Sequence, residues 1–366
     1  MEFKIILKGM IDRNASDLHV RSDHPGVFRT DGQLTAKTEP ISGEQVAQWV
    51  KSILNDRQAK IFEANLECDL AISVEGLGRF RVNVYRQRGL INMAIRLVPS
   101  FIPSFDQLKL PPVIRKIADE PRGLILVTGT TGSGKSTTLA AMIDYINSTR
   151  SRHIVTIEDP IEYVHEDKQS IVSQRELSQD TLTFPEALKH VVRQDPDVVL
   201  LGEMRDLETM AAALTAAQTG HLVMSTIHTI DAMQTVNRII DVFPPHQQNQ
   251  IRFQLADTLR GVISQRLLSH ASGSGRVPAV EVMVVTPIVR KFILENTLGE
   301  ISAIMKQGSY YGMQTFHQAL VSLINRNEIT LETALGASSN PEEVMMAVRG
   351  VQTGTEDSSH FFPPQP

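Results

Sequence analysis

The clearest chemical signature in the chain is a glycine-rich segment, GTTGSGKS at 129–136, which follows the phosphate-binding pattern G-x-x-x-x-G-K-[ST]. An apolar, β-prone run at 124–128 precedes it, and a helical pattern at 137–147 follows it. The glycines would let backbone N–H groups turn toward phosphate oxygens, and the helix N-terminus would add its partial positive charge. The residues predicted to bind ATP are Gly129, Thr131, Gly132, Ser133, Gly134, Lys135, Ser136 and Thr137.

Three side chains, two within this segment and one further along the chain, could serve phosphate chemistry directly. Lys135 is expected to reach the β- and γ-phosphates, and Ser136 is expected to hold Mg²⁺. Glu203 follows the buried-strand run 198–201, and residues at the carboxyl ends of strands face the ligand crevice of an open α/β sheet. Glu203 is therefore predicted to meet Mg²⁺ through water, although an ordinary strand-end acid would show the same pattern.

Two further strand ends carry polar residues. The first carries Glu158, Asp159 and Glu162, and any of the three could orient or deprotonate the water that attacks the γ-phosphate. A solvated acidic loop is the plain alternative. The second carries His228, which could donate a hydrogen bond to the γ-phosphate, whereas a lone histidine is more often a structural residue.

Arginines gather near the end of the N-terminal third of the chain. They lie on or beside two β-prone runs and are Arg79, Arg81, Arg86, Arg88 and Arg96. Alternation along a strand places Arg79 and Arg81 on the same face. A solvated sheet face is the ordinary explanation of such charges. The alternative is an arginine donated across a subunit interface to stabilise the transferring phosphate.

The elements that must position these groups fall into two regions. Residues 1–98 are predicted to form a small α+β domain, with helical spacing at 2–13 and 43–64 and β-prone runs at 68–74, 78–85 and 90–98. Prolines mark 99–112 as a linker of limited stiffness. The composition of the tail, 349–366, predicts disorder.

Between the linker and the tail, residues 113–348 alternate β-runs with helical patterns, which predicts a mostly parallel sheet covered on both faces. The expected core strands are 124–128, 153–157, 198–201 and 221–226. Beyond Pro245 the chain is predicted to be mainly helical, at 246–268, 287–295, 300–307, 312–326 and 341–348.

Composition limits the possible functions. The length of 366 residues favours two domains, and a net charge of −5 gives no bulk basic field for nucleic acid or acidic lipid. Cys68 is the single cysteine, so neither a disulfide framework nor a four-cysteine zinc site can form. No stretch approaches 18 uninterrupted apolar residues, so a cytoplasmic protein that meets a membrane only through partners is expected.

These clusters, in this order, resemble the secretion and type IV pilus ATPase superfamily, and most closely its PilT/PilU-like retraction motors. The matching segments are Ser16-Asp17-Leu18-His19, the phosphate loop, an acidic box at 157–163, the stretch 193–206 and a histidine box at 225–229. The resemblance extends over residues 1–348. Extension and type II secretion ATPases usually add an N-terminal domain and a four-cysteine zinc element, and their absence here favours the retraction branch.

The resemblance implies an α/β fold, with a PAS-like N-terminal α+β domain followed by a RecA-like P-loop NTPase domain with a helical C-terminal part. It also implies a homohexamer that binds ATP and Mg²⁺. By the family pattern, Glu162 is the better candidate for the catalytic base and Glu158 a supporting acid. Glu203 would be the Walker B acid and His228 the residue of the histidine box. Arg81 and Arg96 match positions from which arginines approach the nucleotide.

The implied function is a motor that hydrolyses ATP and powers pilus retraction, with an inner-membrane platform protein as partner and no nucleic acid. The family's retraction motif is only partly kept at 287–295, where Arg290, Ile293 and Glu295 remain. One alternative is therefore an accessory ATPase of the PilU kind, acting beside a paralogous pilus ATPase. A secretion or DNA-transport ATPase and a non-motor ATP-binding subunit are the others.

Overall fold

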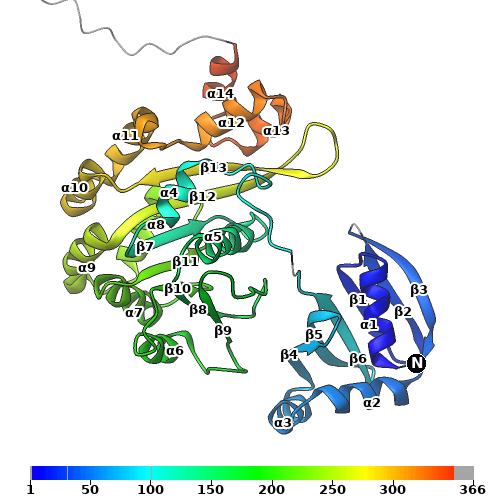
Figure 1. Cartoon of the computed structure of the whole chain (residues 1–366). Coiled ribbons are helices and arrows are strands. Elements are labelled where there is room, and N and C mark those ends of the chain that lie inside the picture. The colour runs from blue at the N-terminus through cyan, green and yellow to red at the C-terminus, as the bar shows by residue number, and fades with distance from the viewer. Residues whose placement is uncertain (1, 31, 100, 350–366) are drawn as a thin grey trace, which may run out of the picture. The chain divides into compact units, whose positions relative to one another are not determined.

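A computed structural model describes residues 2–30, 32–99 and 101–349 of the chain (Figure 1). Within it the chain divides into two compact units. Unit 1 comprises Met1–Ile102 together with two later segments, Asp159–Glu166 and Glu176–Asp180. Unit 2 comprises the rest of the described chain. The predicted tail, apart from Arg349, lies outside the described residues.

Unit 1 begins with a helix and contains a sheet of six strands. Its elements are α1 (Phe3–Asp12), β1 (Asp17–Arg21), β2 (His24–Thr30), β3 (Gln33–Ile41), α2 (Gly43–Ile53), α3 (Asp56–Asn65), β4 (Glu67–Val74), β5 (Gly78–Gln87) and β6 (Leu90–Leu97). The helical and β-prone runs predicted in this region are confirmed, with 43–64 split into two helices. The split falls at Asn55, which caps α3 and completes a capping box with Gln58.

The strands of unit 1 pair antiparallel in the order β3-β2-β1-β6-β5-β4. Alternation along β5 sends Phe80, Val82 and Val84 into the core, where they join apolar residues of the three helices. Arg79 and Arg81 therefore share the other face, as the sequence predicts. One face of this sheet is apolar and covered, and the other carries charge.

Unit 2 contains the remaining helices and strands. Its elements are α4 (Val113–Ala118), β7 (Gly123–Thr128), α5 (Lys135–Thr149), β8 (His153–Glu158), β9 (Ile171–Glu176), α6 (Phe184–Val191), β10 (Val198–Leu201), α7 (Leu207–Gln218), β11 (Leu222–Ile227), α8 (Ala232–Asp241), α9 (Pro245–Thr258), β12 (Leu259–Ser269), β13 (Arg276–Val284), α10 (Pro287–Glu295), η1 (Leu298–Glu300), α11 (Ile301–Gln307), η2 (Gly308–Tyr311), α12 (Phe316–Asn325), α13 (Leu331–Ala337) and α14 (Pro341–Val348).

The seven strands of unit 2 follow the order β13-β12-β7-β11-β10-β8-β9. Strands β12, β7, β11, β10 and β8 run parallel, and β13 pairs antiparallel with β12. The four predicted core strands are confirmed as β7, β8, β10 and β11, within one residue at each end. Apolar residues of α4 and α5 pack on one face of β7. Helices α7 and α9 also contact this strand (Figure 1).

The helix predicted at 246–268 is wrong in its second half. Helix α9 ends at Thr258, and Leu259–Ser269 form β12, which pairs with β7 and β13. Most of the first seven residues of β12 are buried, because the strand lies inside the sheet and is covered on both faces. Its sequence, LRGVISQRLLS, has no regular alternation of apolar and polar residues, so it does not show the period of a strand.

The helix predicted at 312–326 begins later than expected. Helix α12 starts at Phe316, where Thr315 and Gln318 form a capping box. Before it, Gln314 makes an isolated bridge with Val282 of β13. Helices α12, α13 and α14 then pack an apolar cluster with Val277 and Ala279 of β13. In the part of the chain that the structure describes, no helix has the length and apolar character needed to cross a bilayer.

Candidate functional site

The phosphate loop follows β7, a central strand of unit 2 that is buried throughout. Gly129, Gly132 and Gly134 all have positive φ angles, of 141°, 79° and 92°, so the loop uses conformations that favour glycine. A Cβ on Gly129 would lie 2.4 Å from the carbonyl oxygen of Gln265 and 2.5 Å from Ser133 Oγ. The loop is therefore formed by residues that could not be replaced without moving its backbone.

Lys135 is the first residue of α5, and Gly134 occupies the N-cap position of that helix. The lysine is buried, with 8% of its surface exposed. Its Nζ donates hydrogen bonds to the carbonyl oxygens of Gly129 and Thr130, at 2.9 and 3.0 Å. The ammonium group thus lies over the loop, where a bound phosphate would meet it together with the helix N-terminus.

Buried polar side chains line the loop from β7, β12 and α5. Thr128 Oγ1 donates to Ser264 Oγ at 3.0 Å, and Gln265 Nε2 donates to Thr138 Oγ1 at 2.8 Å. Ser133 Oγ and Gln265 Oε1 are buried and have no hydrogen-bond partner within the described residues. Buried polar atoms of this kind usually have a partner, so their state here fits a loop made to hold a polar ligand.

Glu203 lies just beyond the carboxyl end of β10 and forms the second part of the cluster. Its Oε1 lies 2.6 Å from Arg205 Nε and 3.3 Å from His228 Nε2. Burial alone would raise the pKa of Glu203, but the hydrogen bond and charge of Arg205, with the charges of His228 and Lys135, lower it below its usual value. Glu203 is therefore ionised, and the charge of Lys135 acts on it.

The donors present suit a magnesium ion. Magnesium prefers hard oxygen ligands and usually keeps several waters. Ser136, in the first turn of α5, supplies a hydroxyl, and the ionised Glu203 supplies a carboxylate. These groups fit the Mg²⁺ ion that accompanies a nucleoside triphosphate.

His228 follows the carboxyl end of β11 and has a side chain that is 44% exposed. Glu158 ends β8, where its Oε1 accepts hydrogen bonds from Thr156 Oγ1 at 2.7 Å and from Gln174 Nε2 at 3.1 Å. Lys135, Glu158, Glu203 and His228 thus follow parallel strands of one sheet at the same edge. The structure confirms this gathering, which the order of the strand ends predicts.

Glu162, Arg81 and Arg96 belong to unit 1 and are not part of this cluster. Glu162 is exposed and lies in the segment Asp159–Glu166. Arg81 and Arg96 are directly opposite each other on β5 and β6, and Asp17 of β1 is opposite Arg96. Arg96 Nε donates to Asp17 Oδ1 at 2.8 Å, whereas Arg81 forms no ion pair within the described residues.

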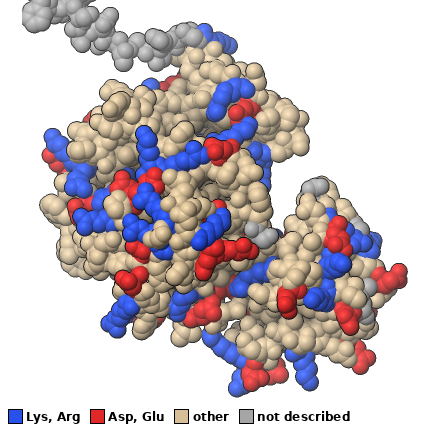
Figure 2. Space-filling view, viewed as in Figure 1, with Lys and Arg blue, Asp and Glu red and all other residues tan. Residues whose placement is uncertain are grey.

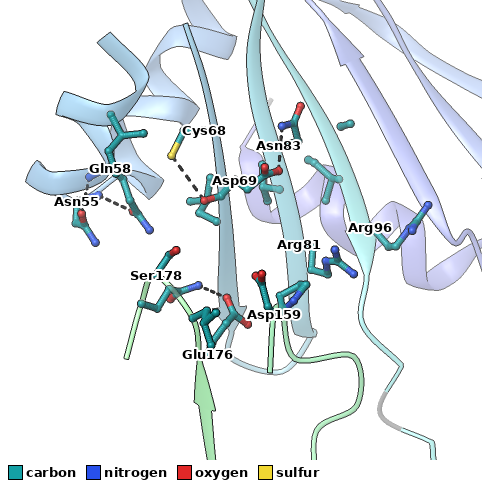
Figure 3. Close-up of a pocket in the computed structure, with 18 of the residues that line it drawn as sticks. Asn55, Gln58, Cys68, Asp69, Arg81, Asn83, Arg96, Asp159, Glu176 and Ser178 are labelled. Atoms are coloured by element: carbon teal, nitrogen blue, oxygen red, sulfur yellow. Dashed lines mark hydrogen bonds between the residues drawn. The ribbon is translucent and has the colours of Figure 1, made fainter. Parts of the chain in front are cut away.

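The row formed by Arg81, Arg96 and Asp17 borders a pocket of about 760 Å³ in unit 1 (Figure 3). Its other charged lining residues come from the sheet, from α3 and from the two later segments of the unit, and they are Arg57, Asp69, Asp159, Glu176 and Asp180. Acids outnumber arginines in this lining, so the pocket by itself is a poor site for a phosphate. The loop built for phosphate belongs to unit 2.

Sequence reasoning assigned no role to three residues that the structure places in these clusters. Arg205 pairs with Glu203, and Asp17 pairs with Arg96. Gln265 lies beside the phosphate loop, in the run that was predicted to be helical. Gln265 stands between Ser264 and Arg266, so the sequence gives no sign of its burial beside the loop. The two ion pairs leave no signal either, because a charged residue does not show which distant charge it will meet.

Comparison with known proteins places the chain in a family. The family described as "Type II/IV secretion system protein" matches residues 3–283. The type IV pilus retraction ATPase PilT of Pseudomonas aeruginosa is 44% identical over 93% of this chain and 99% of its own length. The type IV pilus ATPase PilU of the same organism is 40% identical over 99% of this chain and 94% of its own.

A solved structure is also similar to this chain. The crystal structure of the pilus retraction motor PilT with bound ADP has a TM-score of 0.87 and 44% identity, and the match covers 94% of this chain and 98% of that one. The chain therefore belongs to the type II/IV secretion system protein family, in its branch of pilus retraction ATPases. Its mixed α/β fold matches that of the solved motor, and it is a nucleotide-binding enzyme of the ATPase class.

Proposed function

We propose that this chain is a subunit of an ATP-hydrolysing motor that powers the retraction of type IV pili. The observation that carries the proposal is the cluster at the sheet edge of unit 2. There a buried lysine lies over a glycine loop in which a Cβ on Gly129 would meet the carbonyl oxygen of Gln265, and the charge of the lysine acts on an ionised glutamate. This is the arrangement that binds and polarises a triphosphate.

Each predicted site residue has a role in this proposal. The loop from Gly129 to Thr137 binds the phosphates, and Lys135 neutralises the β- and γ-phosphates. Ser136 and Glu203 would hold Mg²⁺, which supplies charge neutralisation between phosphate oxygens. Glu162 acts as the base that orients the attacking water, and Glu158 supports it. His228 donates a hydrogen bond to the γ-phosphate.

The arginines of unit 1 complete the chemistry. Arg81 stabilises the charge that develops on the transferred phosphate. It forms no ion pair among the described residues, so its guanidinium is available to the phosphate. Arg96 contributes less, since it is held by Asp17. Unit 1 corresponds to the PAS-like domain and unit 2 to the RecA-like domain of the family. The linker 99–112 is the hinge on which they move when a subunit of the hexamer closes on ATP.

The partners follow from the same proposal. The ring works in the cytoplasm against an inner-membrane platform protein, so the chain meets the membrane only through that partner. A nucleic acid is not proposed as a partner. In the view of Figure 2 basic and acidic side chains are interspersed over the surface, without the broad basic field that a translocated DNA strand would need.

A second candidate is an accessory role beside another pilus ATPase. It is favoured by the similarity to PilU, which extends over 99% of this chain. In this role the chain hydrolyses ATP but retraction depends on a paralogous motor. The two candidates share the site and differ in whether this chain's own turnover is needed.

The test uses a strain that lacks this gene, complemented with the wild type or with Glu203→Gln, with pilus number and twitching motility as readouts. A primary motor predicts excess surface pili without motility, rescued by the wild type alone. Rescue by Glu203→Gln supports the accessory role. A deletion that leaves both pilus number and motility unchanged contradicts a role in retraction.

A further inference from the structure

A buried carboxylate in unit 1 takes no part in the chemistry proposed above. Glu176 ends β9, and only 3% of its surface is exposed. A carboxylate at such a depth is costly unless charged and hydrogen-bonding partners surround it. Within the described residues, the partners of its side chain and backbone N–H all come from unit 1.

The partners of Glu176 come from three places in the sequence. Its Oε2 lies 2.8 Å from Nη2 of Arg79 and accepts a hydrogen bond from the backbone N–H of Ile161 at 3.1 Å. Its Oε1 accepts a hydrogen bond from Gln179 Nε2 at 2.5 Å. Its own N–H donates to Asp180 Oδ2 at 2.8 Å. Oε2 therefore joins β5 to the segment Asp159–Glu166 through a single atom.

Both of the joined segments carry residues of the proposed mechanism. Arg79 shares a face of β5 with Arg81, two residues further on. Ile161 immediately precedes Glu162. Arg81 and Glu176 line the same pocket, and Figure 3 shows both beside it. The carboxylate is thus bonded to Arg79, two residues before Arg81, and to Ile161, the residue before Glu162.

Arg79 has little else to hold it. Its side chain is 20% exposed, its Nε is buried without a hydrogen-bond partner within the described residues, and its other hydrogen bond is to Ser73 Oγ at 3.5 Å. Loss of the Glu176 charge would leave a poorly solvated cation without a counter-ion, so β5 would have to shift at this point.

We propose that Glu176 is a positioning residue for ATP hydrolysis, whose carboxylate holds the strand of Arg81 and the segment of Glu162 in one fixed arrangement. It acts through these two residues. The inference rests on the roles given to Arg81 and Glu162 under the proposed function. Small displacements of reacting groups reduce turnover more than they reduce substrate binding when the binding groups lie elsewhere.

The central experiment compares Glu176→Gln with the wild type in the full chain, by steady-state ATP hydrolysis. Glutamine keeps the shape and one acceptor but removes the charge that pairs with Arg79. We expect kcat to fall about 10-fold while the KM for ATP changes less than about 2-fold, because the phosphate loop belongs to unit 2. A thermal melt and circular dichroism establish the folded fraction of each variant.

Two matched variants accompany it. Arg79→Lys keeps a cation but cannot reach the carboxylate as Arg79 does, and it should lower kcat in the same way. The double variant should be no worse than the stronger single variant, because both changes break one contact. Glu186→Gln is the control, since Glu186 pairs with Lys189 on the surface, and it should keep wild-type kinetics.

The outcomes separate this inference from the proposed function. Full turnover by Lys135→Ala would overturn the proposed function and this inference with it. If Lys135→Ala and Glu162→Gln abolish turnover but Glu176→Gln keeps the wild-type kcat, only the positioning role is overturned. The same holds if activity falls only in proportion to the unfolded fraction, or if the double variant shows additive losses. Should Glu176→Gln fail to fold, Arg79→Lys decides by the same criteria.

Discussion

Unit 2 gathers its charged residues at one edge of a parallel sheet, whereas unit 1 sets its arginines across antiparallel strands, each beside an acid or another arginine. In unit 2 burial raises the pKa of Glu203, but the hydrogen bond and charge of Arg205, followed by His228 and Lys135, lower it below its usual value. In unit 1, Arg79 is bound to Glu176 and Arg96 to Asp17. The first region is assembled to receive an anion. Of Arg79, Arg81 and Arg96, only Arg81 forms no ion pair among the described residues.

The two sheets position their charged residues in different ways. A parallel sheet brings the carboxyl ends of its strands together, so residues that are distant in the chain meet without any direct contact between their own segments. In an antiparallel sheet the register decides which residues lie directly opposite each other. A charged residue there is neutralised or left available to a ligand according to the residue opposite it.

Removal of the cation from the phosphate loop should have the largest effect. Lys135→Ala is expected to lower kcat by about 100-fold or more, because the ammonium group of Lys135, bonded to the carbonyl oxygens of Gly129 and Thr130, supplies positive charge at the loop. Steady-state ATP hydrolysis measures it. Lys168→Ala is the control, since Lys168 pairs with Asp144 at the surface, and it should hydrolyse ATP at the wild-type rate. Comparable losses in both variants would contradict a specific role for Lys135.

The shape of the loop can be broken without any change of charge. Gly129→Ala should destabilise the protein by about 2–4 kcal/mol and weaken ATP binding, because φ is 141° and the new Cβ meets the carbonyl of Gln265. Gly336→Ala, in α13 with open space around it, should instead stabilise by about 0.5–1 kcal/mol. Thermal melts compare the two. Equal effects would mean that the loop geometry is not as constrained as described.

Each unit has a buried glutamate, and the two differ in their partners. Glu281 of β13 accepts hydrogen bonds from the N–H groups of Ala232 and Phe316 but forms no ion pair within the described residues. Burial raises the pKa of Glu281 to about 7, with Asp231 adding to the rise and the two N–H groups and Arg266 opposing it. Glu176, by contrast, is paired with Arg79.

The raised pKa fixes the sign of the effect. The folded protein keeps the proton of Glu281 to a higher pH than the unfolded chain does, so this stabilisation is present below about pH 4.5 and is lost as pH rises through about 7. Glu281→Gln should remove this loss, which is on the order of 3 kcal/mol at most. Melts between pH 5 and 8 should show wild-type stability falling relative to the variant. A constant difference across that range would refute it.

The smallest effect is expected at the surface of unit 1. Asp17→Asn breaks an ion pair whose arginine is 63% exposed, so it should cost less than about 1 kcal/mol of stability. Burial raises the pKa of Asp17, but hydrogen bonds from Arg96 and Ser16 lower it by more than that. The pKa is therefore below its usual value, and the carboxylate is charged in the folded state. A loss above about 2 kcal/mol in a denaturant titration would show that Asp17 also supports the core.

The positions of the candidate residues of unit 2 relative to its strands could be predicted, whereas their roles stay predictions. Its loop has a fixed residue pattern, and Glu203 and His228 each follow a buried strand, which are signals local to the sequence. The exceptions are Arg205, whose pairing with Glu203 leaves no local signal, and Gln265, because the sequence of β12 has no strand period. Gln265 lies beside Gly129 because β12 pairs with β7. These two strands are more than 130 residues apart in the chain, as the contact between Thr128 and Ser264 shows.

In unit 1 the sequence predicted the shared face of Arg79 and Arg81 but not their partners. Arg79 and Glu176 are separated by 97 positions, and Arg96 and Asp17 by 79. Alternation determines which side of a strand a residue occupies, but it does not determine which strand comes next or which loop lies above it. Charge pairs of this kind depend on tertiary packing and leave no periodic signal.

The most direct test of the account is ATP hydrolysis by Arg81→Ala, with ATP binding measured on the same protein by a fluorescent nucleotide analogue. If unit 2 binds the phosphates and unit 1 supplies the arginine that hydrolysis requires, binding should stay within about 3-fold of wild type while kcat falls by about 100-fold or more. Wild-type turnover by Arg81→Ala would contradict the account, because unit 2 would then complete the reaction alone.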